Sequence, residues 1–125
     1  MRVIYDAGVL VAADRDDRRI WADHRARLEL GAVPSTTAPV VAQASRSPRQ
    51  VQLRRFLRGC EMVAFGAEDA HEVGLLLGSA GTSDVVDGHV VTTAARTASA
   101  VLTSDPDDLA HLSSHLPERI HVRRI

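Results

Sequence analysis

Three aspartates occupy positions at which α/β proteins commonly carry out their chemistry. Asp6 comes directly after the β-rich residues 2–5. Asp105 comes just after the apolar residues 100–103, and Asp87 lies at the start of a helix. In an open α/β sheet, the end of a strand and the start of a helix packed on it face the same edge, where ligands bind. We therefore expect these three carboxylates to meet at one edge of a sheet.

Carboxylates that gather without a cation raise one another's pKa and oppose burial, and a divalent cation relieves that repulsion. Hard oxygen ligands suit Mg²⁺ or Mn²⁺. Such an ion can bind a phosphodiester oxygen and lower the pKa of an attacking water. The pattern therefore indicates phosphodiester hydrolysis.

Helix capping is the alternative interpretation of the same acids. Asp84, three residues before Asp87, has the spacing of an N-cap followed by an acid in the first turn. Asp105 is followed by Pro106, which is typical of an N-cap and a first helical residue. Only the positions of the carboxylates relative to one another can decide between capping and chemistry.

The elements that must position these acids alternate along the chain. Apolar or small residues recur at intervals of three and four from Asp87 onward, as on one buried helical face. The helix from Ala67 is predicted to end at Gly78. Gly74 and Gly78 of this helix are expected to permit close packing against another helix. In the helix of residues 48–60, Val51 is predicted to face the core. The predicted strands are residues 2–5, 33–37, 61–65, 100–103 and 120–125. The predicted helices are residues 8–13, 17–31, 39–45, 48–60, 67–77, 87–98 and 109–116. This alternation predicts one mostly parallel sheet flanked by helices on both faces.

Length and composition indicate one globular domain over residues 1–125. Hydrophobic residues make up 45% and charged residues 25%, so the chain is not expected to be disordered. The aromatic content of 3% argues against a nucleic-acid surface built on stacked aromatic rings. The single cysteine, Cys60, suits a reducing compartment, and neither a signal peptide nor an apolar run of ~18 residues is present. We expect a cytoplasmic protein.

The basic residues suggest a phosphate-binding segment although the formal net charge is -1. All 15 basic residues are arginine, and no acid occurs between Glu29 and Glu61. The planar guanidinium can donate two hydrogen bonds to one phosphate, although a GC-rich coding genome would also yield a chain without lysine. The predicted phosphate contacts are Arg46, Arg49, Arg54, Arg55 and Arg58.

Three parts of the chain resemble a known family: one stretch near each end, and the predicted helices between them in their order and length. VIYDAGVLVA near the start and VVDGHVVTTAARTASAVLTSD near the end are similar to PIN-domain ribonucleases, and within them to the small VapC-like toxins of toxin-antitoxin pairs. The resemblance implies a three-layer PIN-like fold and RNA cleavage at a Mg²⁺ or Mn²⁺ site. It matches Asp6, Asp87 and Asp105 to the family's acidic metal ligands, with Asp84 and Thr103 in supporting positions. It also implies a VapB-like antitoxin and a homodimer.

Gln43 departs from the family pattern, which has glutamate in the short helix after the second strand. A glutamine keeps an acceptor oxygen but lacks the negative charge, so we expect weaker metal binding and weaker activity. Asp84, Asp107 and Asp108 are candidates to restore that charge. The alternative function is therefore a non-catalytic PIN-like domain that binds RNA or a protein. A phosphoryl-accepting receiver-like domain would need a lysine at the sheet edge, and the chain has none.

Overall fold

The computed structural model describes residues 2–125, which form one α/β domain. The strands are β1 (Val3–Tyr5), β2 (Ser35–Thr37), β3 (Glu61–Val63), β4 (Ala100–Thr103) and β5 (Val122–Arg124). The helices are α1 (Ala7–Asp14), α2 (Arg18–Glu29), α3 (Ala38–Ala44), α4 (Val51–Leu57), α5 (Ala67–Ala80), α6 (Val85–Thr97) and α7 (Pro106–Ser113).

The five strands form one sheet in the order β3-β2-β1-β4-β5, and every neighbouring pair is parallel. The expected mostly parallel sheet is thus wholly parallel. Tyr5 is level with Thr36 of β2 and with Leu102 of β4, so these three strands end within one residue of one another. Their next residues, among them Asp6, therefore emerge together at one edge.

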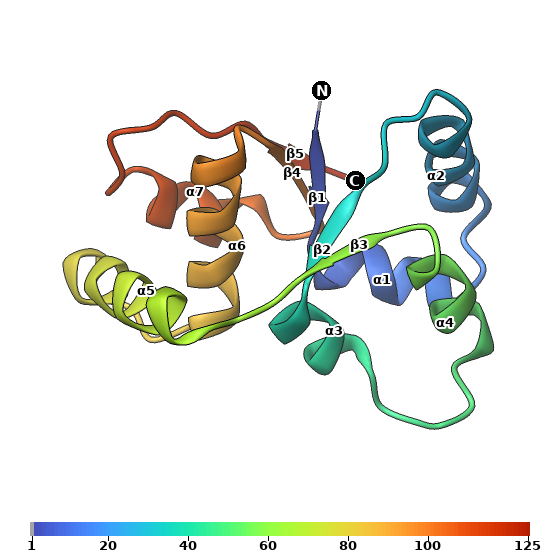
Figure 1. The fold of residues 1–125 in the computed structure, drawn as a ribbon, viewed down its shortest axis with the longest axis horizontal. Coiled ribbons are helices and arrows are strands. Elements are labelled where there is room, and N and C mark those ends of the chain that lie inside the picture. The colour runs from blue at the N-terminus through green and yellow to red at the C-terminus, as the bar shows by residue number, and fades with distance from the viewer. Residues whose placement is uncertain (1) are drawn as a thin grey trace.

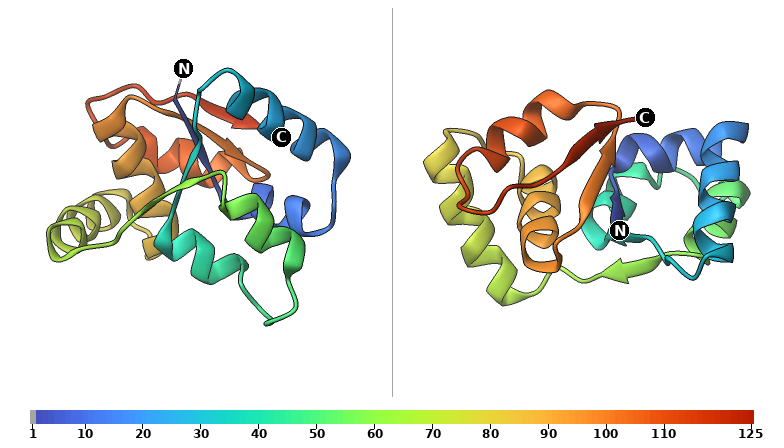
Figure 2. Two further views of the ribbon diagram at one scale, coloured as in Figure 1. Left: turned by 45° about the vertical axis from the view of Figure 1, so that its right-hand side comes forward. Right: turned by 90° about the horizontal axis from the view of Figure 1, so that it is seen from above.

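Helices cover both faces of the sheet (Figure 1). α1, α2 and α4 lie on one side, and α5, α6 and α7 lie on the other, as the view from above in Figure 2 also shows. α3 follows β2 at the carboxyl edge of the sheet and contacts both α1 and α6. The molecule therefore has three layers, as the sequence predicts.

A small aromatic cluster packs α2 and α4 against β1. The Tyr5 ring lies 5.3 Å from that of Phe56, which stacks on His24 at 4.0 Å between centroids. Trp21 meets Phe56 edge to face at 5.0 Å, and its Nε1 donates to the Ala13 carbonyl. Edge-to-face and offset stacking are favourable arrangements of aromatic rings. The cluster thus contributes much of the core on this face despite the low aromatic content.

Two local predictions about helices are wrong. The helix from Ala67 continues through Gly78 and ends at Gly81, whose positive φ of 72° forms the left-handed C-cap. Close packing occurs at neither Gly74 nor Gly78, since a Cβ at either would meet no atom within 4 Å. Helix periodicity does not reveal which of several glycines adopts a positive φ.

The arginine-rich segment is less helical than predicted. α4 begins at Val51, after the turn that contains Arg49, and not at Pro48. Val51 is 53% exposed and does not face the core, which α4 reaches through Leu53 and Phe56. Within residues 2–125, no helix is long and apolar enough to cross a membrane.

Candidate active site

Asp6 and Asp105 are linked through one threonine at the carboxyl edge of the sheet. Thr103, the last residue of β4, is fully buried, and its Oγ1 donates a 2.7 Å hydrogen bond to Oδ2 of Asp6. The same hydroxyl accepts a 3.0 Å hydrogen bond from the backbone N–H of Asp105. The backbone N–H of Asp6 donates to the Leu102 carbonyl at 3.0 Å, which extends the contact between β1 and β4 past the end of β1. Thr103 therefore orients the Asp6 carboxylate and positions the backbone at Asp105.

Gly8 permits the close approach between α1 and the loop after β4. A Cβ at Gly8 would lie 2.8 Å from Cβ of Ser104, closer than real Cβ contacts, and would also overlap the Ser104 hydroxyl. The first turn of α1 can therefore rest against Ser104 only because residue 8 has no side chain. This role of Gly8 was not predicted from the sequence, although a glycine two residues after a strand-end acid was a visible signal.

α6 brings two further acids to the same edge. Asp84 caps this helix, because its Oδ1 accepts a 3.0 Å hydrogen bond from the backbone N–H of Asp87. Gly88 lets α6 pack closely on α5, where a Cβ would lie 2.8 Å from Cγ1 of Val73. Figure 1 shows α6 beginning beside α3, at the end of the molecule where β1 and β2 finish.

The electrostatics of Asp87 show that acids from several segments converge. Burial is the largest of the causes that together raise the pKa of Asp87 from 3.8 to about 7, and the negative charges of Asp84, Asp6, Asp108 and Asp105 follow in that order. These groups come from the end of β1, from the start of α6 and from the β4–α7 segment. The charges of acids from all three segments therefore act on Asp87.

Asp105 lies in the same negative field. Asp108, by its charge and by a hydrogen bond, and Asp107 by its charge raise the pKa of the Asp105 carboxyl, while the Arg124 guanidinium lowers it. Arg124 also donates a 3.2 Å hydrogen bond from Nη1 to the Ser104 carbonyl. This arginine of β5 is the second residue of the site that was not predicted from the sequence, since only the pairing of β5 with β4 brings it here.

Capping accounts for only one of the three acids at helix starts. Asp84 caps α6 through its side chain. Asp6 and Asp105 occupy the N-cap positions of α1 and α7, yet neither side chain accepts a capping hydrogen bond. Asp6 is instead 8% exposed and accepts its hydrogen bond from Thr103. The capping interpretation is thus correct for Asp84 and wrong for Asp6 and Asp105.

The chemistry of these donors fits a hard divalent cation. The groups around Asp87 are all carboxylates, and removing their mutual repulsion is what such an ion does. Across residues 2–125, however, no group of three or more His, Cys, Asp or Glu side chains is placed so that it could hold a metal ion. Mg²⁺ retains several waters and needs only one or two direct carboxylate ligands, so a looser arrangement of acids remains compatible with it. Asp6, Asp87 and Asp105 are the side chains that would hold the ion.

Gln43 lies in α3, the short helix that starts at the sheet edge. Thr37 caps α3 by accepting a 3.2 Å hydrogen bond from the Val40 N–H. Gln43 is exposed in the last turn of this helix, and in the described chain its side chain makes no hydrogen bond. Because α3 contacts both α1 and α6, Gln43 belongs to the element between the two acid-bearing segments.

The predicted phosphate-binding arginines are all exposed: Arg46, Arg49, Arg54, Arg55 and Arg58. Arg46 and Arg54 donate to backbone carbonyls of their own segment, and Arg55 lies over the Trp21 ring. None of the five pairs with a carboxylate in the part of the chain that the structure describes, where the only arginine in an ion pair is Arg96. α4 lies beyond α1, on the side of the sheet opposite α6 (Figures 1 and 2). These arginines therefore lie to one side of the acids and do not surround them.

Solved structures of other proteins share this fold. VapBC2 from Rickettsia felis, solved with a DNA fragment from its promoter, aligns over 100% of this chain and 99% of that chain with a TM-score of 0.69 and 15% identity. FitAcB from Neisseria gonorrhoeae aligns over 96% of this chain and 95% of that chain, with a TM-score of 0.65 and 15% identity. PAE2754 from Pyrobaculum aerophilum aligns over 97% and 89%, with a TM-score of 0.64 and 13% identity. No family model and no curated protein matches the sequence. The expected PIN-like fold is confirmed.

Proposed function

We propose that this protein is a VapC-like, metal-dependent endoribonuclease that hydrolyses RNA phosphodiester bonds. The reaction would occur at the edge of the sheet that carries Asp6, Asp87 and Asp105, which we call the acidic edge. The observation that carries the proposal is the environment of Asp87, where burial and the charges of acids from three separate segments together raise the pKa of one carboxyl to about 7. If these aspartates served only as helix caps, their charges would not be expected to act together on one carboxyl group. The fold shared with VapBC2 and FitAcB supports the same conclusion.

The acidic residues would have separate roles in metal binding. Asp6, buried and fixed by the Thr103 hydroxyl, would be the rigid ligand of Mg²⁺ or Mn²⁺. Asp87 and Asp105 would complete the binding from α6 and from the β4–α7 segment, and Asp84 would hold the start of α6 in place. When bound, the cation would polarise a phosphodiester oxygen and lower the pKa of the attacking water.

Gln43 would lower the affinity of this site for metal, because it supplies one negative charge fewer than the family's glutamate. Asp108, which acts on both Asp87 and Asp105, is the acid of the chain best placed to compensate. We propose that the protein nevertheless turns over, with Mn²⁺ as the more effective cofactor because its geometric demands are looser than those of Mg²⁺.

The proposed partner is a VapB-like antitoxin, and the proposed assembly is a homodimer in the cytoplasm. Support comes from the fold shared with VapBC2 and FitAcB, whose names denote toxin-antitoxin proteins. The exposed arginines of residues 46–58 are the proposed contacts to RNA phosphates outside the acidic edge.

Cleavage of a panel of structured RNAs with Mn²⁺ tests the proposal. Wild-type protein should cleave at least one RNA, chelation should abolish cleavage, and Asp6→Asn should lose it while remaining folded. Arg2→Ala, which changes an exposed residue at the opposite end of β1, is the matched control and should cleave like wild type. Cleavage that persists in Asp6→Asn would come from a contaminating nuclease and would contradict the proposal.

A non-catalytic PIN-like binding domain is the second candidate. Gln43 in place of the usual glutamate and the absence of a ready-made ligand set over residues 2–125 favour it. It predicts RNA or protein binding that neither Mn²⁺ nor Asp6→Asn alters, with no cleavage of any RNA in the panel.

A further inference from the structure

A cavity of about 270 Å³ lies between α2, the end of β1 and the C-terminal strand β5. We propose that it binds one nucleotide of the RNA strand next to the scissile phosphate, with arginines on the phosphate and an apolar floor beneath the ribose and base. The proposal rests on RNA being the ligand of the acidic edge. It adds a subsite whose residues no sequence motif marks.

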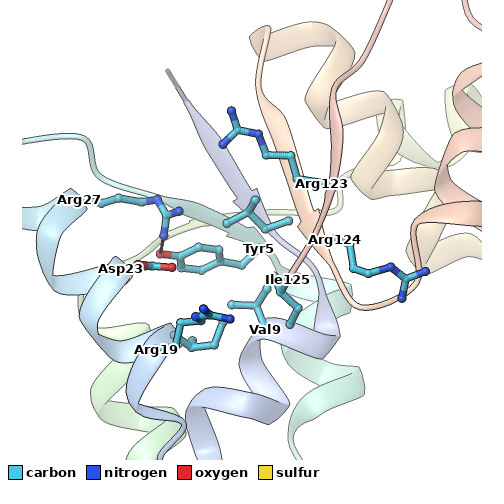
Figure 3. Close-up of a pocket in the computed structure, with 10 residues that line it drawn as sticks. Tyr5, Val9, Arg19, Asp23, Arg27, Arg123, Arg124 and Ile125 are labelled. Carbon is cyan, nitrogen blue, oxygen red and sulfur yellow. Dashed lines mark hydrogen bonds between the residues drawn. The ribbon is translucent and has the colours of Figure 1, made fainter.

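The wall of the cavity is positively charged. Arg19 and Arg27 of α2 and Arg123 and Arg124 of β5 line it, and Asp23 is the one acidic side chain among the lining residues. Arg19 and Arg27 lie on one side of Tyr5 and Arg123 on the other, while the Arg124 side chain points away from Tyr5 (Figure 3). Within residues 2–125, none of these arginines forms an ion pair with a carboxylate. The wall therefore carries a net positive charge, and guanidinium groups bind phosphate well.

The floor of the cavity is apolar and rigid. Tyr5, Val9 and Leu102 line it from β1, α1 and β4, and all three are buried. The Tyr5 hydroxyl is held by His24 Nδ1 at 3.0 Å and by a 3.3 Å hydrogen bond from Arg27 Nη1, which Figure 3 shows as a dashed line. Arg27 is thus fixed at the wall before any ligand arrives. RNA-binding proteins commonly bind unstacked nucleotides in pockets that combine apolar and guanidinium groups.

The cavity and the acidic edge share a residue. Arg124 lines the cavity, donates to the Ser104 carbonyl and lowers the pKa of Asp105. Tyr5 and Leu102 of the floor directly precede Asp6 and Thr103 in the chain. A strand whose phosphate lies at the acids would therefore continue along Arg124 into the cavity. This continuity with the proposed nuclease site, together with the apolar floor of the cavity, favours RNA over an acidic peptide.

The test is RNA binding without cleavage. A fluorescein-labelled single-stranded RNA is titrated in EDTA with wild-type protein and with Arg19→Ala/Arg123→Ala, whose side chains are exposed and make no hydrogen bond within residues 2–125. Arg2→Ala/Arg119→Ala removes the same charge from exposed positions outside the cavity and is the matched control. The cavity variant should bind about tenfold more weakly, and its salt dependence should fall by about 0.7 in log–log slope, since the loss of one neutralised phosphate removes about 0.7. The control should lose less than about twofold.

Equal losses in the two double variants, or unchanged RNA affinity in the cavity variant, would overturn the proposal. It would also be overturned if wild type binds no RNA, or if the cavity variant loses binding of a poly-glutamate peptide but not of RNA. Circular dichroism should show both variants folded, and Arg19→Lys/Arg123→Lys should keep the wild-type salt slope.

Cleavage assays with Mn²⁺ separate the subsite from the nuclease function. Wild-type protein that binds RNA through the cavity without cleaving it would contradict the nuclease function alone. If the wild-type protein cleaves RNA and Arg19→Ala/Arg123→Ala cleaves it equally well, the result would contradict the subsite alone.

Discussion

The Thr103 hydroxyl donates a 2.7 Å hydrogen bond to Asp6 across 97 residues of sequence, and this bond joins the two halves of the acidic edge. The same oxygen accepts a hydrogen bond from the backbone N–H of Asp105. The two acids that follow β1 and β4 thus depend on a single buried side chain.

Thr103→Val should disturb the site more than it disturbs the fold. Valine has nearly the shape of threonine but leaves the Asp6 carboxylate and the Asp105 N–H without their partner. We expect the free energy of unfolding to fall by about 1–2 kcal/mol and RNA cleavage to fall at least about tenfold. Urea denaturation and initial cleavage rates measure the two effects. Thr93→Val is the matched control, since Thr93 is equally buried and its hydroxyl has no partner within residues 2–125, so its stability should be unchanged or higher.

Gly8→Ala should separate α1 from the loop after β4. The added Cβ would overlap Ser104, and relieving that overlap should cost about 1–3 kcal/mol of unfolding free energy and most of the cleavage activity. Ser104→Gly in the same chain removes the clashing atoms and should restore much of both. Gly78→Ala, at an open and exposed helical position, should instead raise the unfolding free energy by about 0.5–1 kcal/mol. Equal behaviour of the two alanine variants would contradict the role assigned to Gly8.

Asp87→Asn should stabilise the metal-free protein at alkaline pH and have little effect in acid. The pKa of Asp87 is about 7 in the folded protein against 3.8 as its ordinary value, so the folded state binds its proton more tightly than the unfolded chain does. Stability contributed by this group is therefore greatest below about pH 4 and is lost as pH rises toward about 7. Because the group is only half-buried, we expect a gain on the order of 1–2 kcal/mol at about pH 8 after discounting solvent screening.

Urea denaturation in EDTA at about pH 5 and about pH 8 measures that difference. Saturating Mn²⁺ should abolish the advantage of Asp87→Asn, because the cation neutralises the field that raises the pKa in the wild type. An advantage that is the same at both pH values, or that survives Mn²⁺, would mean that Asp87 does not belong to a cation site.

Gln43→Glu should strengthen Mn²⁺ binding about three- to tenfold and raise cleavage activity, because it restores a negative charge beside the acids. Isothermal titration calorimetry measures the affinity. Gln52→Glu makes the same change of charge on α4, away from the acids, and should leave the affinity within about twofold of wild type. No gain from Gln43→Glu would show that residue 43 does not reach the ion.

Patterns along the chain were enough to predict the elements and the acids at their ends. Alternating apolar runs depend on neighbours a few residues apart, so the strand at Ala100–Thr103 and the parallel α/β class were both predicted correctly. The roles of Asp6, Asp87 and Asp105 in binding metal stay predictions that the experiments above address.

The contacts of those acids became visible only in the folded chain. Asp105 and Asp84 look equally like N-caps in the sequence, yet only Asp84 caps its helix. The bond from Thr103 to Asp6 and the approach of Arg124 depend on strand register, which is set by packing between segments distant in the chain. Local patterns carry no information about that register, and for this reason the site's geometry could not be obtained before its segments were assembled.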